Sequence, residues 1–281
     1  MSGTLFIVAT PIGNLEDLTP RARQTLASVD LIAAEDTRHT MRLLSNIGAK
    51  PALMALHDHN EERAAYKVME ALESGKDVAL VSDAGTPLVS DPGFRVVREA
   101  HKQGIKVVPL PGASAVTAAL SAAGLPTDRF SFEGFAPAKR VARRKWLESL
   151  ANETRTIIMY ESVHRIDECL ADLVEGFGPD RNAFIGRELT KLHEQCVRGT
   201  LGKLKRLIDE GAIPRKGEFV IVVAGAERGP DSGVDVDRLL RLLSSHLSAN
   251  QAARITAELT GQKKNALYER ILTFKADNDD S

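Results

Sequence analysis

The feature that most constrains the fold is an alternation of short apolar runs with helical stretches between Thr4 and Gly124. Such an alternation is typical of a mostly parallel sheet whose strands are joined by covering helices. We therefore expect an α/β fold, with strands at 5–9, 31–34, 78–82 and 105–110, helices at 20–28, 61–74 and 93–103, and an alanine-rich helix that opens at 112–114.

The segment Leu125-Pro-Thr-Asp128 interrupts this pattern and marks a domain boundary. Beyond it only two or three helices separate the expected strands, so several strands must be neighbours in an antiparallel or mixed sheet. These strands are 130–135, 156–160, 182–188, 195–200 and 218–224. Residues 234–274 are expected to be helical throughout, with two helices meeting at Gly261, an arrangement that can bind nucleic acid or simply complete a bundle. The prediction is an N-terminal α/β domain (1–125), a second α/β domain (126–230) and a C-terminal helical segment (231–281).

Charge and composition exclude little at the level of the whole chain. The formal net charge is −1, so any case for a nucleic-acid partner depends on local basic runs, each of which is more often a solvated surface. These runs are 139–145 (KRVARRK), 203–206, 215–216 and 263–264. No apolar stretch is long enough to cross a bilayer, and only Cys169 and Cys196 could pair. We expect a reduced, cytoplasmic location and no membrane association.

Polar and small residues follow each of the first four expected strands. Because ligands bind at the carboxyl ends of parallel strands, four such loops together predict a binding site. The loops are 10–14 (TPIGN), 35–39 (EDTRH), 83–87 (DAGTP) and 111–115 (PGASA). None is a GxGxxG or GxxxxGK[ST] motif, which disfavours nicotinamide cofactors and nucleotide hydrolysis.

Three further clusters are candidates for the wall of that site. The run 56–61 (LHDHNE) contains His57, Asp58 and His59, but adjacent side chains point in different directions and no other ligands stand at metal-binding spacing, so no metal is expected. Asp58 or Asn60 could instead cap the following helix. The segments 160–165 (YESVHR) and 187–191 (RELTK) mix acidic, basic and hydroxyl groups at strand ends, as a cleft lip would.

Many segments, in this order and spacing, resemble the ribosomal RNA methyltransferases of the tetrapyrrole methylase superfamily. They include VATPIGNLEDLT (8–19), AAEDTRHT (33–40), LHDHNE (56–61), LVSDAGTPLVSDPG (80–93), PLPGASA (109–115), YESVHR (160–165), GRELTK (186–191) and KKNALY (263–268). Superfamily members that act on corrinoids and porphyrins usually have a GDP-type loop where this chain has Gly85-Thr86-Pro87. The resemblance therefore covers nearly the whole chain and favours the RNA-modifying branch.

The resemblance implies two α/β domains of tetrapyrrole methylase type that hold S-adenosylmethionine in the cleft between them, without a metal, in a homodimer. Position by position it implies donor contacts, mostly through the backbone, at Pro11, Ile12, Ala84, Gly85, Thr86, Val89, Ser114, Ala115, Glu161 and Leu189. The implied reaction is methylation of the ribose 2'-oxygen of a cytidine in the decoding region of 16S rRNA, in naked RNA or in the assembled small subunit.

Methyl transfer is an in-line displacement, so positioning supplies much of the acceleration, and a base that takes the hydroxyl proton would add to it. The local candidates are Asp36, His39, His57 and Asp58, of which Asp36 and His57 rank first, although a purely positional mechanism is an alternative. Arg38 could hold a phosphate. Further phosphate contacts are expected at Arg143, Arg144, Lys263 and Lys264.

Competing predictions are a tetrapyrrole-like small-molecule methyltransferase of the same superfamily, which would need no basic helices, and a non-catalytic RNA-binding assembly protein, which would have a degraded donor site. The basic runs and the intact loops disfavour both.

Overall fold

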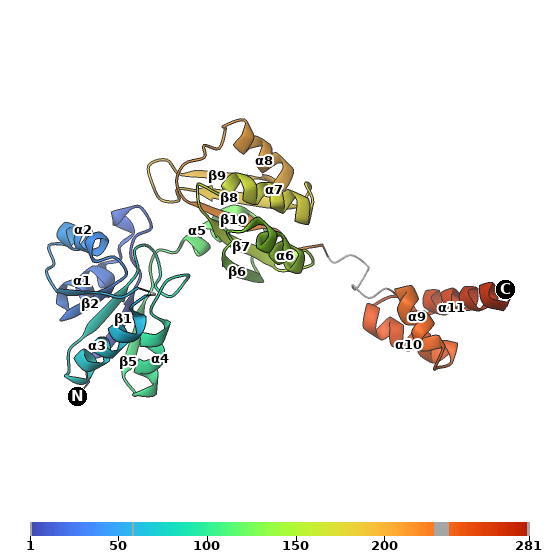
Figure 1. Ribbon diagram of the computed structural model, residues 1–281, viewed down its shortest axis with the longest axis horizontal. Coiled ribbons are helices and arrows are strands. Elements are labelled where there is room, and N and C mark those ends of the chain that lie inside the picture. The colour runs from blue at the N-terminus through green and yellow to red at the C-terminus, as the bar shows by residue number, and fades with distance from the viewer. Residues whose placement is uncertain (1, 58, 228–235, 280–281) are drawn as a thin grey trace. The chain divides into compact units, whose positions relative to one another are not determined.

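The computed structural model describes residues 2–57, 59–227 and 236–279. It comprises two compact units, residues 1–224 and 225–281, and each is treated by itself (Figure 1). Asp58, one of the expected wall residues, lies outside the described residues. No helix in the described part of the chain is long and apolar enough to cross a membrane.

The first unit begins with a five-stranded, wholly parallel sheet in the order β3-β2-β4-β1-β5. Its strands are β1 (Thr4–Val8), β2 (Leu31–Ala34), β3 (Ala52–Ala55), β4 (Val78–Val81) and β5 (Lys106–Leu110). Its helices are the short 3-10 helix η1 (Leu15–Asp17), α1 (Pro20–Ser28), α2 (Thr37–Ile47), α3 (Glu61–Glu73) and α4 (Phe94–Lys102).

Helices cover both faces of this sheet, with α1 and α2 on one side and α3 and α4 on the other (Figure 1). Strand β4 needs cover on both faces, because all four of its residues are buried. Val78 and Leu80 point into the core under α3 and α4, whereas Ala79 and Val81 point into the core under α1 and α2. A strand buried on both faces is a continuous apolar run, as the sequence pattern predicted.

The second sheet is mixed, in the order β6-β7-β10-β8-β9, with β6 parallel to β7 and the other pairs antiparallel, so that prediction is confirmed. Its strands are β6 (Phe130–Phe135), β7 (Thr156–Glu161), β8 (Asn182–Arg187), β9 (Gln195–Thr200) and β10 (Phe219–Val223). Helices α6 (Arg140–Leu150), α7 (Ile166–Phe177) and α8 (Leu201–Asp209) pack on one face.

The other face is covered by the alanine-rich helix α5 (Ala115–Ala123). Its Val116, Ala119 and Leu120 share a core with Ile158 of β7 and Val222 of β10. The small side chains let this helix lie close to the second sheet, although it follows directly from the first. Both sheets thus belong to one compact unit, and the boundary placed at 125–128 stays a prediction.

Residues 236–279 form three helices, α9 (Val236–Ser244), α10 (Ala249–Thr260) and α11 (Lys264–Asp279), around a small apolar core. Ser248 and Gln251 form a reciprocal capping box at the start of α10, and Gly261 ends that helix at φ 70°. The two helices expected around Gly261 are therefore confirmed, and α9 is an additional helix.

Candidate active site

A cleft of about 510 Å³ lies in the first unit, where loops from both sheets meet. The first sheet contributes the loops at the carboxyl ends of its strands, as expected for an open parallel sheet. The second sheet contributes the ends of β6 and β7 and the start of β10. The lining residues are Ile12, Glu35, Asp83–Thr86, Val89–Asp91, Ser114, Ala115, Phe135, Tyr160–Ser162 and Glu218–Val220.

Most donor-site candidates from the sequence meet in this cleft, namely Ile12, Ala84, Gly85, Thr86, Val89, Ser114, Ala115 and Glu161. The two exceptions lie close by. Pro11 lines an adjoining cavity, and Leu189 is buried in a core that also contains Ile12. The four-loop pattern therefore located a real concavity, whereas the role of each residue stays a proposal.

Backbone hydrogen bonds join two of the loops. The Thr10 amide donates to the Gly85 carbonyl at 2.9 Å, and the Gly85 amide donates to the Thr10 carbonyl at 3.0 Å. Gly85 has φ +85°, and a Cβ there would lie 3.3 Å from Cγ2 of Ile12, so a larger residue would be both strained and crowded. The Thr86 hydroxyl donates to the Ala113 carbonyl at 3.2 Å, which ties in the fourth loop.

Backbone strain is concentrated in two loops beside the cleft. Within residues 2–57, 59–227 and 236–279, the non-glycine residues with positive φ are Leu88, Ser90, Glu188 and Thr190. Each such residue costs about 1–3 kcal/mol and persists only where the surroundings enforce it. Ser90 itself lines the cleft. The strained residues thus lie in the loops 83–93 and 187–191, and both loops contain residues that line the cleft or the adjoining cavity.

Glu161 is buried, with only 1% of its surface exposed. One carboxylate oxygen accepts from the Ser162 amide at 2.7 Å and from the Arg165 guanidinium at 2.8 Å. Burial, followed by the charge of this carboxylate, raises the pKa of the Cys169 thiol. Glu161 therefore lines the cleft as a buried carboxylate held by an amide and a guanidinium.

Tyr160 lines the cleft and begins the segment 160–165, which was expected to form a cleft lip, although no donor contact was assigned to it from the sequence. Its ring lies 4.9 Å from that of Phe132 and 5.5 Å from that of Phe135, both in edge-to-face geometry. Burial, together with the nearby carboxylates of Asp91 and Glu218, raises the pKa of Tyr160 to about 12. The phenol therefore stays neutral and forms an aromatic wall.

Glu35 and Asp83 contribute two carboxylates to the cleft, and each begins one of the four predicted loops, although neither was assigned a role of its own from the sequence. The Asp83 amide donates to Glu35 at 3.3 Å, and the Asp36 amide donates to Asp83 Oδ1 at 3.0 Å. Their positions in the sequence mark them as strand-end residues, because Glu35 directly follows β2 and Asp83 comes two residues after the end of β4.

Neither of the two leading proton-acceptor candidates lines this cleft or the adjoining cavity. The Asp36 carboxylate caps α2 by accepting the Arg38 amide at 2.8 Å. The His57 amide donates to Asn60 Oδ1 at 2.9 Å, and its buried Nδ1 has no partner among the described residues. Asn60 thus closes a turn before α3 and makes no side-chain cap. Catalysis by Asp36 or His57 stays a prediction without geometric support.

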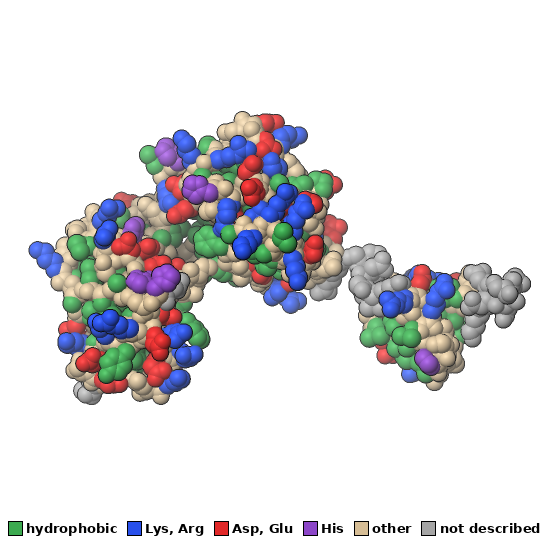
Figure 2. All heavy atoms as spheres, in the orientation of Figure 1, with side chains coloured by type: hydrophobic (Ala, Val, Ile, Leu, Met, Phe, Trp, Pro, Cys, Tyr) green, Lys and Arg blue, Asp and Glu red, His purple; other side chains and the backbone are tan. Residues whose placement is uncertain are grey.

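The predicted RNA contact at Arg143 is wrong. The side chain is 0% exposed and donates to Asp172 at 2.7 Å and to Glu168 at 3.2 Å. Basic and acidic side chains lie side by side over α6 and α7 (Figure 2). Arg140 and Arg143 lie one turn apart and therefore share a face of α6. Both bind Asp172 of α7, so this face packs against α7.

The other RNA-binding candidates are accessible to different degrees. Arg144 is 41% exposed but pairs with Asp172 and Glu175. Arg38 is exposed in the first turn of α2, and Lys263 and Lys264 are exposed at the start of α11. These four positions stay proposals.

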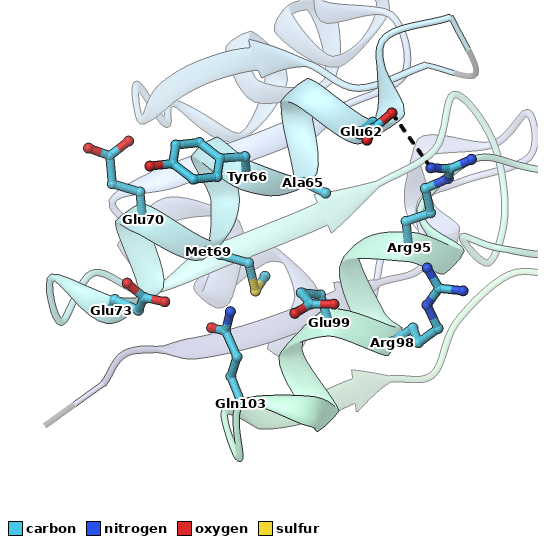
Figure 3. A pocket seen from close by; sticks show the side chains of 10 residues that line it. All are labelled: Glu62, Ala65, Tyr66, Met69, Glu70, Glu73, Arg95, Arg98, Glu99 and Gln103. Carbon is cyan, nitrogen blue, oxygen red and sulfur yellow. Dashed lines mark ion pairs between the residues drawn. The ribbon is translucent and has the colours of Figure 1, made fainter.

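A groove of about 400 Å³ between α3 and α4 shares no residue with the cleft (Figure 3). Its walls mix Glu62, Glu70 and Glu99 with Arg95 and Arg98, and an ion pair of 3.9 Å joins Arg95 to Glu62. No chemistry expected from the sequence maps to it. In the described part of the chain, no three His, Cys, Asp or Glu residues are grouped as metal ligands.

Comparisons with known proteins agree with this geometry. Residues 4–205 match the family of Tetrapyrrole (Corrin/Porphyrin) Methylases, and residues 230–275 match the RsmI C-terminal HTH domain. Among solved structures, cobalt precorrin-4 methyltransferase (TM-score 0.56, 18% identity, 79% of this chain and 94% of that chain) and diphthine synthase (TM-score 0.58, 17% identity, 79% and 90%) share the fold.

Curated relatives are far more similar. Ribosomal RNA small subunit methyltransferase I of Xylella fastidiosa is 53% identical over 267 residues, covering 95% of this chain and 98% of the relative. The proteins of the same name from Pseudomonas aeruginosa (96% of this chain, 97% of the relative) and Escherichia coli O157:H7 (96% and 95%) are each 49% identical. The chain belongs to the tetrapyrrole methylases and, within them, to the ribosomal RNA small subunit methyltransferase I family. The predicted resemblance and fold class are confirmed.

Proposed function

We propose that the chain transfers a methyl group from S-adenosylmethionine to RNA of the small ribosomal subunit. The observation that carries the proposal is that nearly all donor-site candidates line one cleft. About 510 Å³ is within the usual range for a small-molecule site. Residues 84–86 and 114–115 line the cleft with small side chains that leave room for an adenosine, and the carboxylates of Glu35 and Asp83 suit a cationic ligand. When bound, the donor supplies an activated methyl group on a sulfonium.

The RNA substrate rests on different support. The relatives at 49–53% identity are named ribosomal RNA small subunit methyltransferases, and the second unit matches a helix-turn-helix domain. We take the finer target from the sequence motifs: the 2'-oxygen of a cytidine in the decoding region of 16S rRNA. Such a nucleotide must be unpaired or splayed out, because side chains do not read bases through the deep groove of an A-form helix.

Arg38, Arg144, Lys263 and Lys264 are the proposed phosphate contacts. Lys263 and Lys264 have the strongest case, since both are exposed and Lys264 opens α11, where the helix dipole adds positive potential. A homodimer is proposed from the family resemblance, and sedimentation equilibrium of the purified chain tests it.

The deciding experiment combines the purified chain with labelled S-adenosylmethionine and small subunits from cells that lack the modification. We expect label on one cytidine ribose, mapped by nuclease digestion and mass spectrometry. Assembled subunits and extracted RNA are compared side by side to identify the true substrate. Measurable donor binding with no label on either form would contradict the proposal and direct the search to small-molecule acceptors.

A further inference from the structure

A second cavity of about 330 Å³, here called the side cavity, adjoins the cleft. The two share Ile12, Asp83, Ala84 and Glu218, so they meet at the carboxyl ends of β1 and β4. A ligand in the cleft and a second ligand in the side cavity would therefore be neighbours. The cleft alone provides a donor site, whereas transfer needs such a neighbouring place for the acceptor.

One face of α2 forms a wall of the side cavity. His39, Arg42, Leu43 and Asn46 line it and recur at helical spacing, three and four residues apart. Arg42 and His39 are exposed and make no ion pair with any residue in the described ranges. An uncommitted guanidinium on a cavity wall suits a phosphate, which it can bind through two parallel hydrogen bonds.

The lining also includes Lys191, a cation that is held in place by ion pairs. The Lys191 ammonium lies 2.9 Å from Glu188 and 2.9 Å from Glu218. The strained loop that bears it approaches closely, since a Cβ on Gly13 would lie 2.3 Å from Cγ of Lys191. The Lys191 side chain is thus held at the side cavity by two carboxylates and by close packing against Gly13.

Asp83 stands where the two cavities meet. Its Oδ1 accepts the Asp36 amide at 3.0 Å, which fixes the carboxylate at the end of β4. Its other oxygen makes no hydrogen bond with the residues that the structure describes. The carboxylate therefore retains an acceptor that a ligand hydroxyl can use.

From this arrangement we infer that the side cavity binds the ribose and phosphate of the acceptor nucleotide, with Arg42 on the phosphate and Asp83 on the 2'-hydroxyl. The inference rests on the proposed function. As the ribose oxygen forms its bond to the methyl carbon, the carbon–sulfur bond breaks and its electron pair returns to sulfur. The hydroxyl proton passes to Asp83. The products are the methylated ribose, S-adenosylhomocysteine and a protonated carboxyl group that releases its proton to water.

The first test is Arg42→Gln in the full chain. The charge-matched control is Arg23→Gln, at an exposed position of α1. Loss of a charge-assisted hydrogen bond corresponds to about a tenfold or larger effect. We expect KM for small subunits to rise by about that factor in Arg42→Gln, with the Kd for S-adenosylhomocysteine unchanged. Equal KM values for the two variants would overturn the phosphate contact.

The second test is Asp83→Asn, which keeps an oxygen for the Asp36 amide, with Asp128→Asn as an exposed control. Loss of a general base lowers turnover by about 100-fold or more. We expect kcat to fall by that factor with an unchanged KM for small subunits. An unchanged kcat would remove Asp83 from the mechanism. If the unaltered chain binds donor but methylates no RNA, the proposed function fails and the inference falls with it.

Discussion

Arg143 and Asp172 are both fully buried, and their charged groups lie 2.7 Å apart. Removal of one member of a buried ion pair leaves the other charge desolvated and costs roughly 3–5 kcal/mol. We therefore expect Arg143→Leu to lower the free energy of unfolding by about that amount in urea titrations. Arg206→Leu, at a position 68% exposed, should change it by less than about 0.5 kcal/mol. Similar values for the two variants would show that Arg143 is not structural.

Glu153 provides a pH-dependent test at the residue scale. Hydrogen bonds from Arg155 lower the pKa of Glu153 from 4.5 to about 2. Because the unfolded chain binds this proton more readily, the pairing stabilises the fold above pH 4.5 and the contribution is lost as the pH falls towards 2. We expect Glu153→Gln to flatten the decline in unfolding free energy over this range. Parallel curves for the variant and the unaltered chain would contradict the pairing.

The position of the cleft could be predicted from the sequence because it depends on loops that the backbone forms. Glycine, proline and small residues after apolar strands mark loops whatever their tertiary partners are. The identity of charged groups could not be predicted in the same way. Arg143 is buried because Asp172 of α7 lies opposite it, and Asp83 is fixed by an amide 47 residues away. Neither the ion pair nor the hydrogen bond can be predicted from the spacing of residues in the sequence.

At the scale of elements, the buried strands were predictable and the edge was not. Strand β4 is apolar throughout, whereas β3 has four residues of intermediate or high exposure and no alternation to detect. Helix α2 was hidden for a related reason, because its first turn, Thr37 to Thr40, is polar and resembled a continuing loop. Its cap, Asp36, was assigned to chemistry.

Helix α5 offers a test of the cleft at this scale. Ala115 lines the cleft at the first turn of α5, while Thr117 is exposed on the same helix. A leucine at 115 should occupy space that the donor needs, so we expect Ala115→Leu to raise the Kd for S-adenosylhomocysteine by about tenfold or more. Thr117→Leu should leave this Kd unchanged in calorimetric titration. Equal affinities would place the donor elsewhere.

At the scale of the whole molecule, we propose that the chain divides the two demands of RNA methylation between its units. Residues 1–224 contain both cavities and the strained loops. Residues 236–279 contain three helices around their own core and two exposed lysines at a helix start. Since phosphate contacts add affinity without fixing the reacting atoms, the second unit can strengthen RNA binding while the first determines the chemistry.

This division predicts a distinct outcome for the double variant Lys263→Gln and Lys264→Gln. Each phosphate contact contributes about 0.7–0.9 to the slope of log affinity against log salt, so the slope for RNA binding should become shallower by about 1.5. The Kd for S-adenosylhomocysteine and the kcat at saturating RNA should stay unchanged, because neither lysine is among the residues that line the cleft. The matched control replaces the exposed Lys50 and Lys76 with glutamine. If both double variants show the same salt slope as the unaltered chain, the lysines of α11 do not contact phosphate.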